Sequence, residues 1–187
     1  MQLKKIFSGI LIIVVVSLVF LGAANNVNSN GNMFAEAAYP STISFSGYSW
    51  YVENSAQPVN PGPNCWSNSP ENVWVDENGW LHLKITYSNG HWYCAELTST
   101  RTFGYGTYAF YTASRIDTLD KNVVLGLFAY KDDSHEVDIE FSKWGILDYS
   151  NGWFTVQPPP YINGVNQKSF NIQLYGCLLY TSDAADE

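Results

Sequence analysis

Basic side chains are scarce in this chain of 187 residues, where 9 Lys and Arg stand against 17 Asp and Glu for a net charge of −8. Apart from Lys4 and Lys5, no two basic residues are adjacent. Nucleic acids and anionic membranes require clustered cations that neutralise their phosphates. The composition therefore argues against both as partners and favours a neutral ligand.

Histidine is also rare, and its placement excludes several kinds of site. His82, His91 and His135 lack the spacing of a zinc site with any Cys or Asp neighbour. We expect no metal and no cofactor in the reaction. Whether the fold binds a structural calcium ion stays open, because no ligand set is recognisable.

Two other catalytic motifs are absent. The stretch FGYG follows no βα pattern, so it is not a phosphate loop, and no GxSxG nucleophile elbow is present.

A long apolar run occurs only at the N-terminus. Lys4 and Lys5 precede apolar residues 6–22, and Ala23 and Ala24 follow, which is the pattern of a secretory signal peptide over residues 1–24. An uncleaved N-terminal membrane anchor is the alternative, since about 17 apolar residues lie at the short end of a membrane span. Either alternative predicts an exported protein. Residues 25–38 have too little apolar content to pack and are expected to be a disordered spacer.

The C-terminal stretch CLLYTSDAADE, residues 177–187, continues no strand or turn pattern from the residues before it. It resembles the in-frame translation of a sequencing adapter, and we interpret it as a non-native tail. The native domain would then span residues 39–176 and be incomplete at its C-terminus.

Three cysteines are present, and one of them lies in this tail. Without Cys177, Cys65 and Cys94 form an even pair in an exported protein, where a disulfide is expected. Such a bond would close a loop of about 30 residues and add about 3 to 4 kcal/mol of stability in the chain-entropy model. Two unpaired thiols are the alternative.

Helical periodicity is absent beyond the N-terminal run, whereas alternation of apolar and polar residues recurs. In WLHLKITY, residues 80–87, Leu81, Leu83, Ile85 and Tyr87 share one face of an expected strand. Further strands are expected at residues 73–76, 91–97, 106–115, 123–130, 135–141 and 153–157, with the proline-rich stretches PVNPGPN and QPPPYING as loops. Short strands at near-regular spacing predict an all-β antiparallel sandwich or barrel.

Three carboxylates alternate with apolar residues in the stretch SHEVDIEFSKWG, residues 134–145. On a strand, Glu136, Asp138 and Glu140 lie in one row, and we expect Val137 and Ile139 to enter the core behind them. Like charges at this spacing repel one another, so folding alone does not favour them. A solvated acidic face is one interpretation, and a catalytic apparatus is the other.

Glycoside hydrolysis offers the catalytic interpretation. Hydrolysis with retention needs two carboxyl groups about 5 to 5.5 Å apart, one a nucleophile and the other an acid that becomes a base. The backbones of Glu136 and Glu140 are roughly 13 Å apart on a strand, so their side chains would have to converge. Asp138 between them can share a proton and hold one glutamate ionised while raising the pKa of the other.

The stretch EVDIEF resembles the active-site strand of glycoside hydrolase family 16, the licheninases, laminarinases and related β-glucanases. CAELTSTRTFGYGTYAF, residues 94–110, is similar to a strand pair of that family, and Asn64-Cys65 with Cys94 is similar to the disulfide-bearing segments of its licheninase branch. The resemblance covers residues 46–176. It implies a concanavalin A-like jelly-roll sandwich of two antiparallel sheets, here incomplete, with a cleft that binds a β-glucan.

Carried over by position, the resemblance makes Glu136 the nucleophile, Glu140 the general acid/base and Asp138 their helper. Glu96 matches a substrate-binding glutamate of the family. The other candidate substrate-binding residues are Tyr105, Trp144 and Trp153 for stacking and Thr155 and Gln157 for hydrogen bonding. Ser134-His135 and Thr98 depart from the licheninase pattern, which leaves specificity for mixed linkages open.

The resulting hypothesis is a secreted, monomeric endo-β-glycosidase that acts on a polysaccharide by double displacement. A transglycosylase would use the same residues with a different acceptor. A non-catalytic carbohydrate-binding module or lectin would be expected to lose one glutamate of the row, whereas this chain has both. Because the family continues with further strands, we expect the truncated chain to fold poorly or aggregate.

Overall fold

The computed structural model describes residues 11–18, 42–104 and 106–174, and these residues form an all-β protein, as the sequence predicts. The described part contains no α-helix and one short 3-10 helix, η1 (Ile116–Thr118). No helix within it is long and apolar enough to cross a membrane. The strands are β1 (Leu11–Leu18), β2 (Thr42–Phe45), β3 (Tyr48–Val52), β4 (Ser55–Val59), β5 (Asn64–Trp66), β6 (Val73–Val75), β7 (Leu81–Leu83), β8 (Thr86–Ser88), β9 (His91–Ser99), β10 (Val123–Asp132), β11 (His135–Phe141), β12 (Gly152–Val156) and β13 (Gln167–Phe170).

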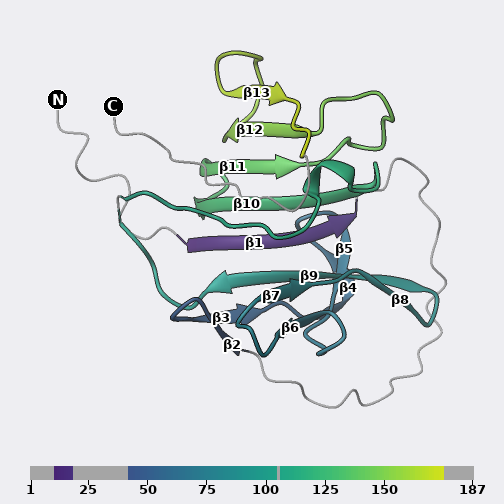
Figure 1. Cartoon of the computed structure of the whole chain (residues 1–187). Helices are drawn as coiled ribbons and strands as arrows, with labels where there is room; N and C mark the ends of the chain where they lie inside the picture. Colours follow the sequence, from purple (N-terminus) through teal and green to yellow (C-terminus); the bar gives the residue numbers. More distant parts are fainter. Residues whose placement is uncertain (1–10, 19–41, 105, 175–187) are drawn as a thin grey trace.

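Eleven strands form one sheet with the main order β13-β12-β11-β10-β1-β9-β3-β2 (Figure 1). β5 and β8 pair with β9, and β4 pairs with β5, while β6 and β7 form a separate two-stranded sheet. All pairs are antiparallel except β5 with β9. This order places the predicted acidic strand, β11, between β10 and β12.

β1 comes from the segment that the sequence predicts as a signal peptide. Its backbone lies between β10 and β9, antiparallel to both, in the interior of the sheet rather than at an edge (Figure 1). Cleavage near Ala24 stays a prediction, and the expected spacer over residues 25–38 and tail over residues 177–187 lie outside the described residues.

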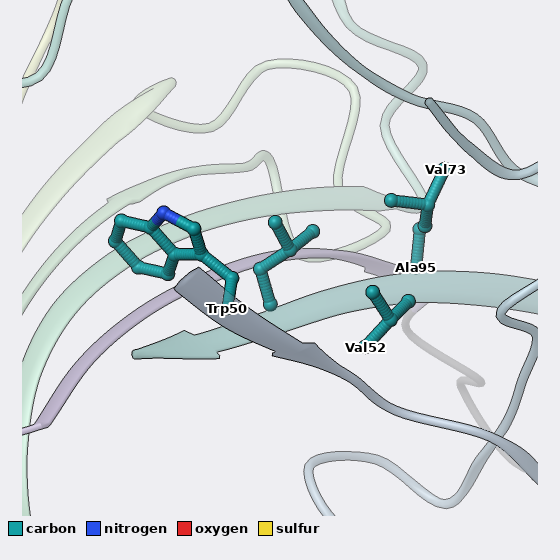
Figure 2. Packing of buried hydrophobic residues seen from close by; sticks show 5 residues of the cluster. Trp50, Val52, Val73 and Ala95 are labelled. Carbon is teal, nitrogen blue, oxygen red and sulfur yellow. The ribbon is translucent and has the colours of Figure 1, made fainter. Parts of the chain in front are cut away.

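The core around β3 and β9 explains why those strands form. Trp50, Val52, Ala95 and Leu97 are buried with Val73 of β6 (Figure 2). In β3 the buried Trp50 and Val52 flank the exposed Tyr51, as in a half-buried strand, and the indole of Trp50 donates a hydrogen bond to the Phe45 carbonyl at 2.9 Å. In β9 the consecutive residues 94–97 are all buried. β9 is thereby fixed between two covered faces.

A second core lies behind β10 and β11. Ile116 of η1, Leu127, Phe141 and Leu174 are buried together. Leu174 is fixed to η1 because its backbone N–H donates to the Asp117 carboxylate at 3.0 Å. This anchoring covers one end of the apolar face of β11, near Phe141.

One predicted strand is absent from the structure, and another is divided in two. Residues 106–115 are irregular, because aromatic side chains such as Phe110 pack on both cores while their backbone pairs with no strand of the described part. The strand predicted over residues 80–87 divides into β7 and β8 at Lys84 and Ile85, where the Lys84 N–H donates to the Asn72 carbonyl. Tyr87 is consequently exposed instead of facing the core.

The predicted disulfide between Cys65 and Cys94 is also wrong, because both cysteines are buried without forming it. β5 and β9 are parallel with Cys65 opposite Tyr93 and Trp66 opposite Cys94. Residues directly opposite each other project to the same face, and successive residues of a strand to opposite faces. The two thiols therefore project to opposite faces of the sheet.

Candidate functional site

β11 spans the predicted residues 135–141, and its register arranges the acidic row among its neighbours. On β10, Tyr130, Phe128 and Gly126 lie opposite Glu136, Asp138 and Glu140 in that order. On β12, Thr155 lies opposite Asp138, and Trp153 lies opposite Glu140. Opposed residues share a face, so the acids, these aromatic residues and Thr155 line one face of the sheet.

The acids are buried more deeply than the apolar residue between them. Asp138 is 5% exposed, whereas Val137 is 47% exposed. The expectation that Val137 enters the core is therefore wrong, although Ile139 does pack against the core behind β11. Phe154 and Val156 of β12, which lie opposite Ile139 and Val137, are also exposed. The face of β11 and β12 that carries the acids is thus less exposed to solvent than the opposite face around Val137, Phe154 and Val156.

Burial determines the charge state of Glu140. Desolvation, followed by repulsion from the Asp138 carboxylate, raises the pKa of Glu140 to about 7. A carboxyl group with this pKa holds its proton at mildly acidic pH and can still release it near neutrality. Those are the requirements for a general acid that later acts as a base.

Glu136 and Asp138 form a coupled pair of carboxyl groups. Desolvation raises the pKa of both, and the charge of Asp138 and a hydrogen bond shared with it raise the pKa of Glu136 further. The same hydrogen bond and one from Gln157 oppose the shift of Asp138, with Gln157 Nε2 3.3 Å from Asp138 Oδ2. The raised pKa values of the two carboxyl groups therefore favour a proton shared between them.

Glu96 lies on β9 in the same register row as Glu140. The row runs from Glu96 through Val15 of β1 and Gly126 of β10 to Glu140, which is three strand steps, or about 14 Å. Desolvation, then the charge of Glu53, raises the pKa of Glu96 to about 7. Thr98, which departs from the licheninase pattern, donates to Glu96 Oε1 at 3.4 Å.

Two buried carboxylate oxygens of this face, Glu96 Oε2 and Asp138 Oδ1, have no hydrogen-bond partner within the part of the chain that the structure describes. A buried polar atom without a partner is costly, and a ligand that supplies donors removes that cost. These two oxygens are therefore unsatisfied hydrogen-bond acceptors on the acidic face.

Only some of the predicted substrate-binding residues lie on the acidic face. Thr155 accepts from Gln167 at 3.4 Å, and Gln157 contacts Asp138, so both belong to the acidic face. Trp153 lies beside Glu140, but it is buried, donates to the Ser142 carbonyl and packs on Tyr149 with ring centroids 4.8 Å apart. Trp144 lies in the turn after β11 with φ of 50°, and Tyr105 lies outside the described residues.

Sequence reasoning missed the contribution of β10. Tyr130 lies opposite Glu136 and donates to Asp133 Oδ1 at 2.8 Å, and Phe128 lies opposite Asp138. The sequence contained a signal for this pairing, because the polar stretch Asp132–Ser134 joins two predicted strands. A hairpin across that stretch places every second residue of β10 opposite one of the acids. Gly126 in turn adds no side chain opposite Glu140.

The described residues contain no group of His, Cys, Asp and Glu that could hold a metal ion. A hollow of about 500 Å³ lies at the β2–β3 turn, lined by Phe45, Tyr48 and Val75 among others, and none of the four acids lines it. The acidic face is therefore the candidate site, with chemistry suited to proton transfer and nucleophilic attack by carboxylates. Comparisons with family models, curated proteins and solved structures gave no match for this chain.

Proposed function

We propose that the chain is a retaining endo-β-glycosidase that hydrolyses a neutral β-glucan-type polysaccharide, built on a jelly-roll sandwich like that of glycoside hydrolase family 16. The observation that carries the proposal is the row of Glu136, Asp138 and Glu140 on one face, with Asp138 buried, both glutamates partly buried and all three pKa values raised. Carboxyl groups that only make a strand face soluble would be exposed to solvent. A carboxyl group that is removed from solvent and has a raised pKa is instead typical of functional sites. Export of the protein, predicted from its N-terminus, is part of the proposal.

In the first step, Glu140 donates its proton to the glycosidic oxygen while the Glu136 carboxylate attacks the anomeric carbon. The bond from that carbon to the leaving oxygen breaks, and a glycosyl ester of Glu136 forms. In the second step, ionised Glu140 removes a proton from water, and the water oxygen displaces Glu136. The pKa of about 7 for Glu140 suits both roles.

Asp138 has to accept the proton of the pair before attack. While the proton shared by the pair lies on Glu136, this residue is a poor nucleophile. When a sugar ring lies against Glu136, transfer of this proton to Asp138 leaves Glu136 ionised and makes Asp138 the hydrogen-bond donor. Gln157 holds Asp138 Oδ2 and orients it for this exchange.

The far side of the face binds the remainder of the polysaccharide. Glu96, with its unpartnered Oε2, lies about 14 Å from Glu140 along the register row, which is more than the width of one sugar ring. A neutral, hydroxyl-rich ligand can donate to both Glu96 and Asp138 without adding charge to an acidic protein. An anionic polysaccharide would meet repulsion from the same acids.

Turnover by the full chain on barley β-glucan, laminarin, xyloglucan and agarose tests the proposal, with Glu136→Ala, Glu140→Ala and Val137→Thr compared. We expect Val137→Thr to retain activity, because Val137 lies on the opposite, exposed face. Both alanine variants should lose at least about 10³-fold in turnover. With an aryl β-glycoside, whose leaving group needs no protonation, added azide should restore turnover and give an α-glycosyl azide with Glu136→Ala and a β-glycosyl azide with Glu140→Ala.

Other outcomes of that experiment are also decisive. Undiminished turnover by Glu136→Ala would contradict the site. Binding of a polysaccharide without turnover of any substrate would favour a lectin. Products longer than the substrate, formed in preference to hydrolysis, would favour a transglycosylase with the same catalytic residues.

A further inference from the structure

The position of β1 in the sheet is unexpected for a segment with the sequence of an export signal. All eight residues of β1 register with Val123–Tyr130 of β10, and Ile13–Val16 also register with Ala95–Thr98 of β9. Figure 1 shows β1 between these two strands. The apolar N-terminal segment is therefore an interior strand that connects the acid-bearing half of the sheet to the half containing β9, β3 and β2.

β9 and β10 are poorly suited to be edge strands. Ala95 and Leu97 of β9 are completely buried, and Val124 and Leu127 of β10 are nearly so. Natural edge strands are short or carry charges, prolines or bulges that prevent further pairing. Without β1, a row of backbone N–H and C=O groups on each strand would lose its partners beside apolar side chains, which is costly.

We infer that the gap between β9 and β10 is a binding site for one extended apolar strand, and that residues 11–18 occupy it in the full chain. The site holds its occupant antiparallel to both neighbours. It excludes a segment with proline at its centre, because the contacts are backbone ladders on both sides. The segment with the pattern of an export signal is thus also the strand that completes the sheet, and its removal opens the site.

The site adjoins the acidic face without depending on the proposed reaction. Val15 registers with Gly126 on one side and with Glu96 on the other. The occupant therefore connects the strand of Glu96 to the strand beside the acids. Loss of the occupant would separate these two parts of the face even if neither has catalytic activity.

Substitution of Val15 in the full chain tests the inference by hydrogen exchange. Val15→Pro removes a backbone donor from the centre of the strand, whereas Val15→Ile keeps the N–H and the branched side chain. We expect Val15→Pro to reduce amide protection at least tenfold at residues 95–98 and 123–130, and Val15→Ile to retain it. Equal protection in the two variants and the parent would overturn the inference.

A cleavable chain gives a second, independent test. A protease site that replaces residues 28–33 allows the N-terminal segment to be separated from the domain after folding. We expect the cleaved segment to co-elute with the domain on gel filtration, and the corresponding segment with Val15→Pro to be lost. Release of the segment with simultaneous unfolding of the domain would also support the inference. Release with an unchanged circular dichroism spectrum and unfolding midpoint would refute it.

Discussion

At the scale of single residues, the acidic face costs stability. Glu96 is buried and Glu140 is partly buried, and desolvation is the main cause that raises the pKa of each to about 7. A group whose pKa is higher in the folded than in the unfolded state stabilises the fold when protonated. Its contribution is complete below its unfolded pKa near 4.5 and is lost as the pH rises through 7.

The free energy of unfolding should therefore fall between about pH 4.5 and pH 7.5. We expect Glu140→Gln to remove on the order of 2 kcal/mol of this fall, because glutamine keeps the shape and never ionises. Urea unfolding at several pH values measures it. If the free energy of unfolding of the variant and of the parent chain fell equally with pH, the pKa of Glu140 would not be raised by folding.

Gln157 was predicted as a cleft residue, and its contact with Asp138 gives it a positioning role as well. Gln157→Met keeps the length of the side chain but removes the donor, so the pKa of Asp138 should rise. We expect the acidic limb of the kcat profile to move to higher pH because of this rise, and kcat to fall because Asp138 is no longer held in its orientation. A rise in KM with kcat and the pH profile unchanged would instead assign Gln157 to substrate binding alone.

At the scale of elements, β11 was predictable and residues 106–115 were not. Strict alternation over residues 135–141 is a local signal, and the strand has these bounds in the structure. Residues 106–115 carry a similar density of aromatic residues, but pairing depends on which backbone lies alongside, which no local pattern contains. The prediction of a disulfide was wrong because it also depends on which residues of two strands lie opposite each other. The register of β5 and β9 places the two thiols one residue out of step.

The two apolar residues of β11 should respond differently to substitution. Val137 is exposed, so Val137→Thr should change the free energy of unfolding by less than about 0.5 kcal/mol. Ile139 packs against the core of Leu127 and Phe141, so Ile139→Thr should cost about 2 kcal/mol. Denaturant unfolding compares the two, and equal costs would mean that Val137 is buried in solution.

At the scale of the whole molecule, the sequence predicted an all-β fold and one acidic face but not the strand order. Short apolar stretches can be recognised one at a time, whereas their neighbours depend on contacts far apart in the chain. β1 is the clearest case, because a segment with the composition of an export signal occupies the centre of the sheet. Glu96 and Glu140 reach the same row through that strand, which no spacing in the sequence could have predicted.

Double displacement by the acidic row is the central step of the proposed function. Proton NMR of a β-glucan digest in its first minutes reports which anomer of the new reducing end is released by the full chain. We predict that the β-anomer appears first and then mutarotates, because two displacements at one carbon restore its configuration. Initial release of the α-anomer would contradict the assignment of Glu136 as a nucleophile.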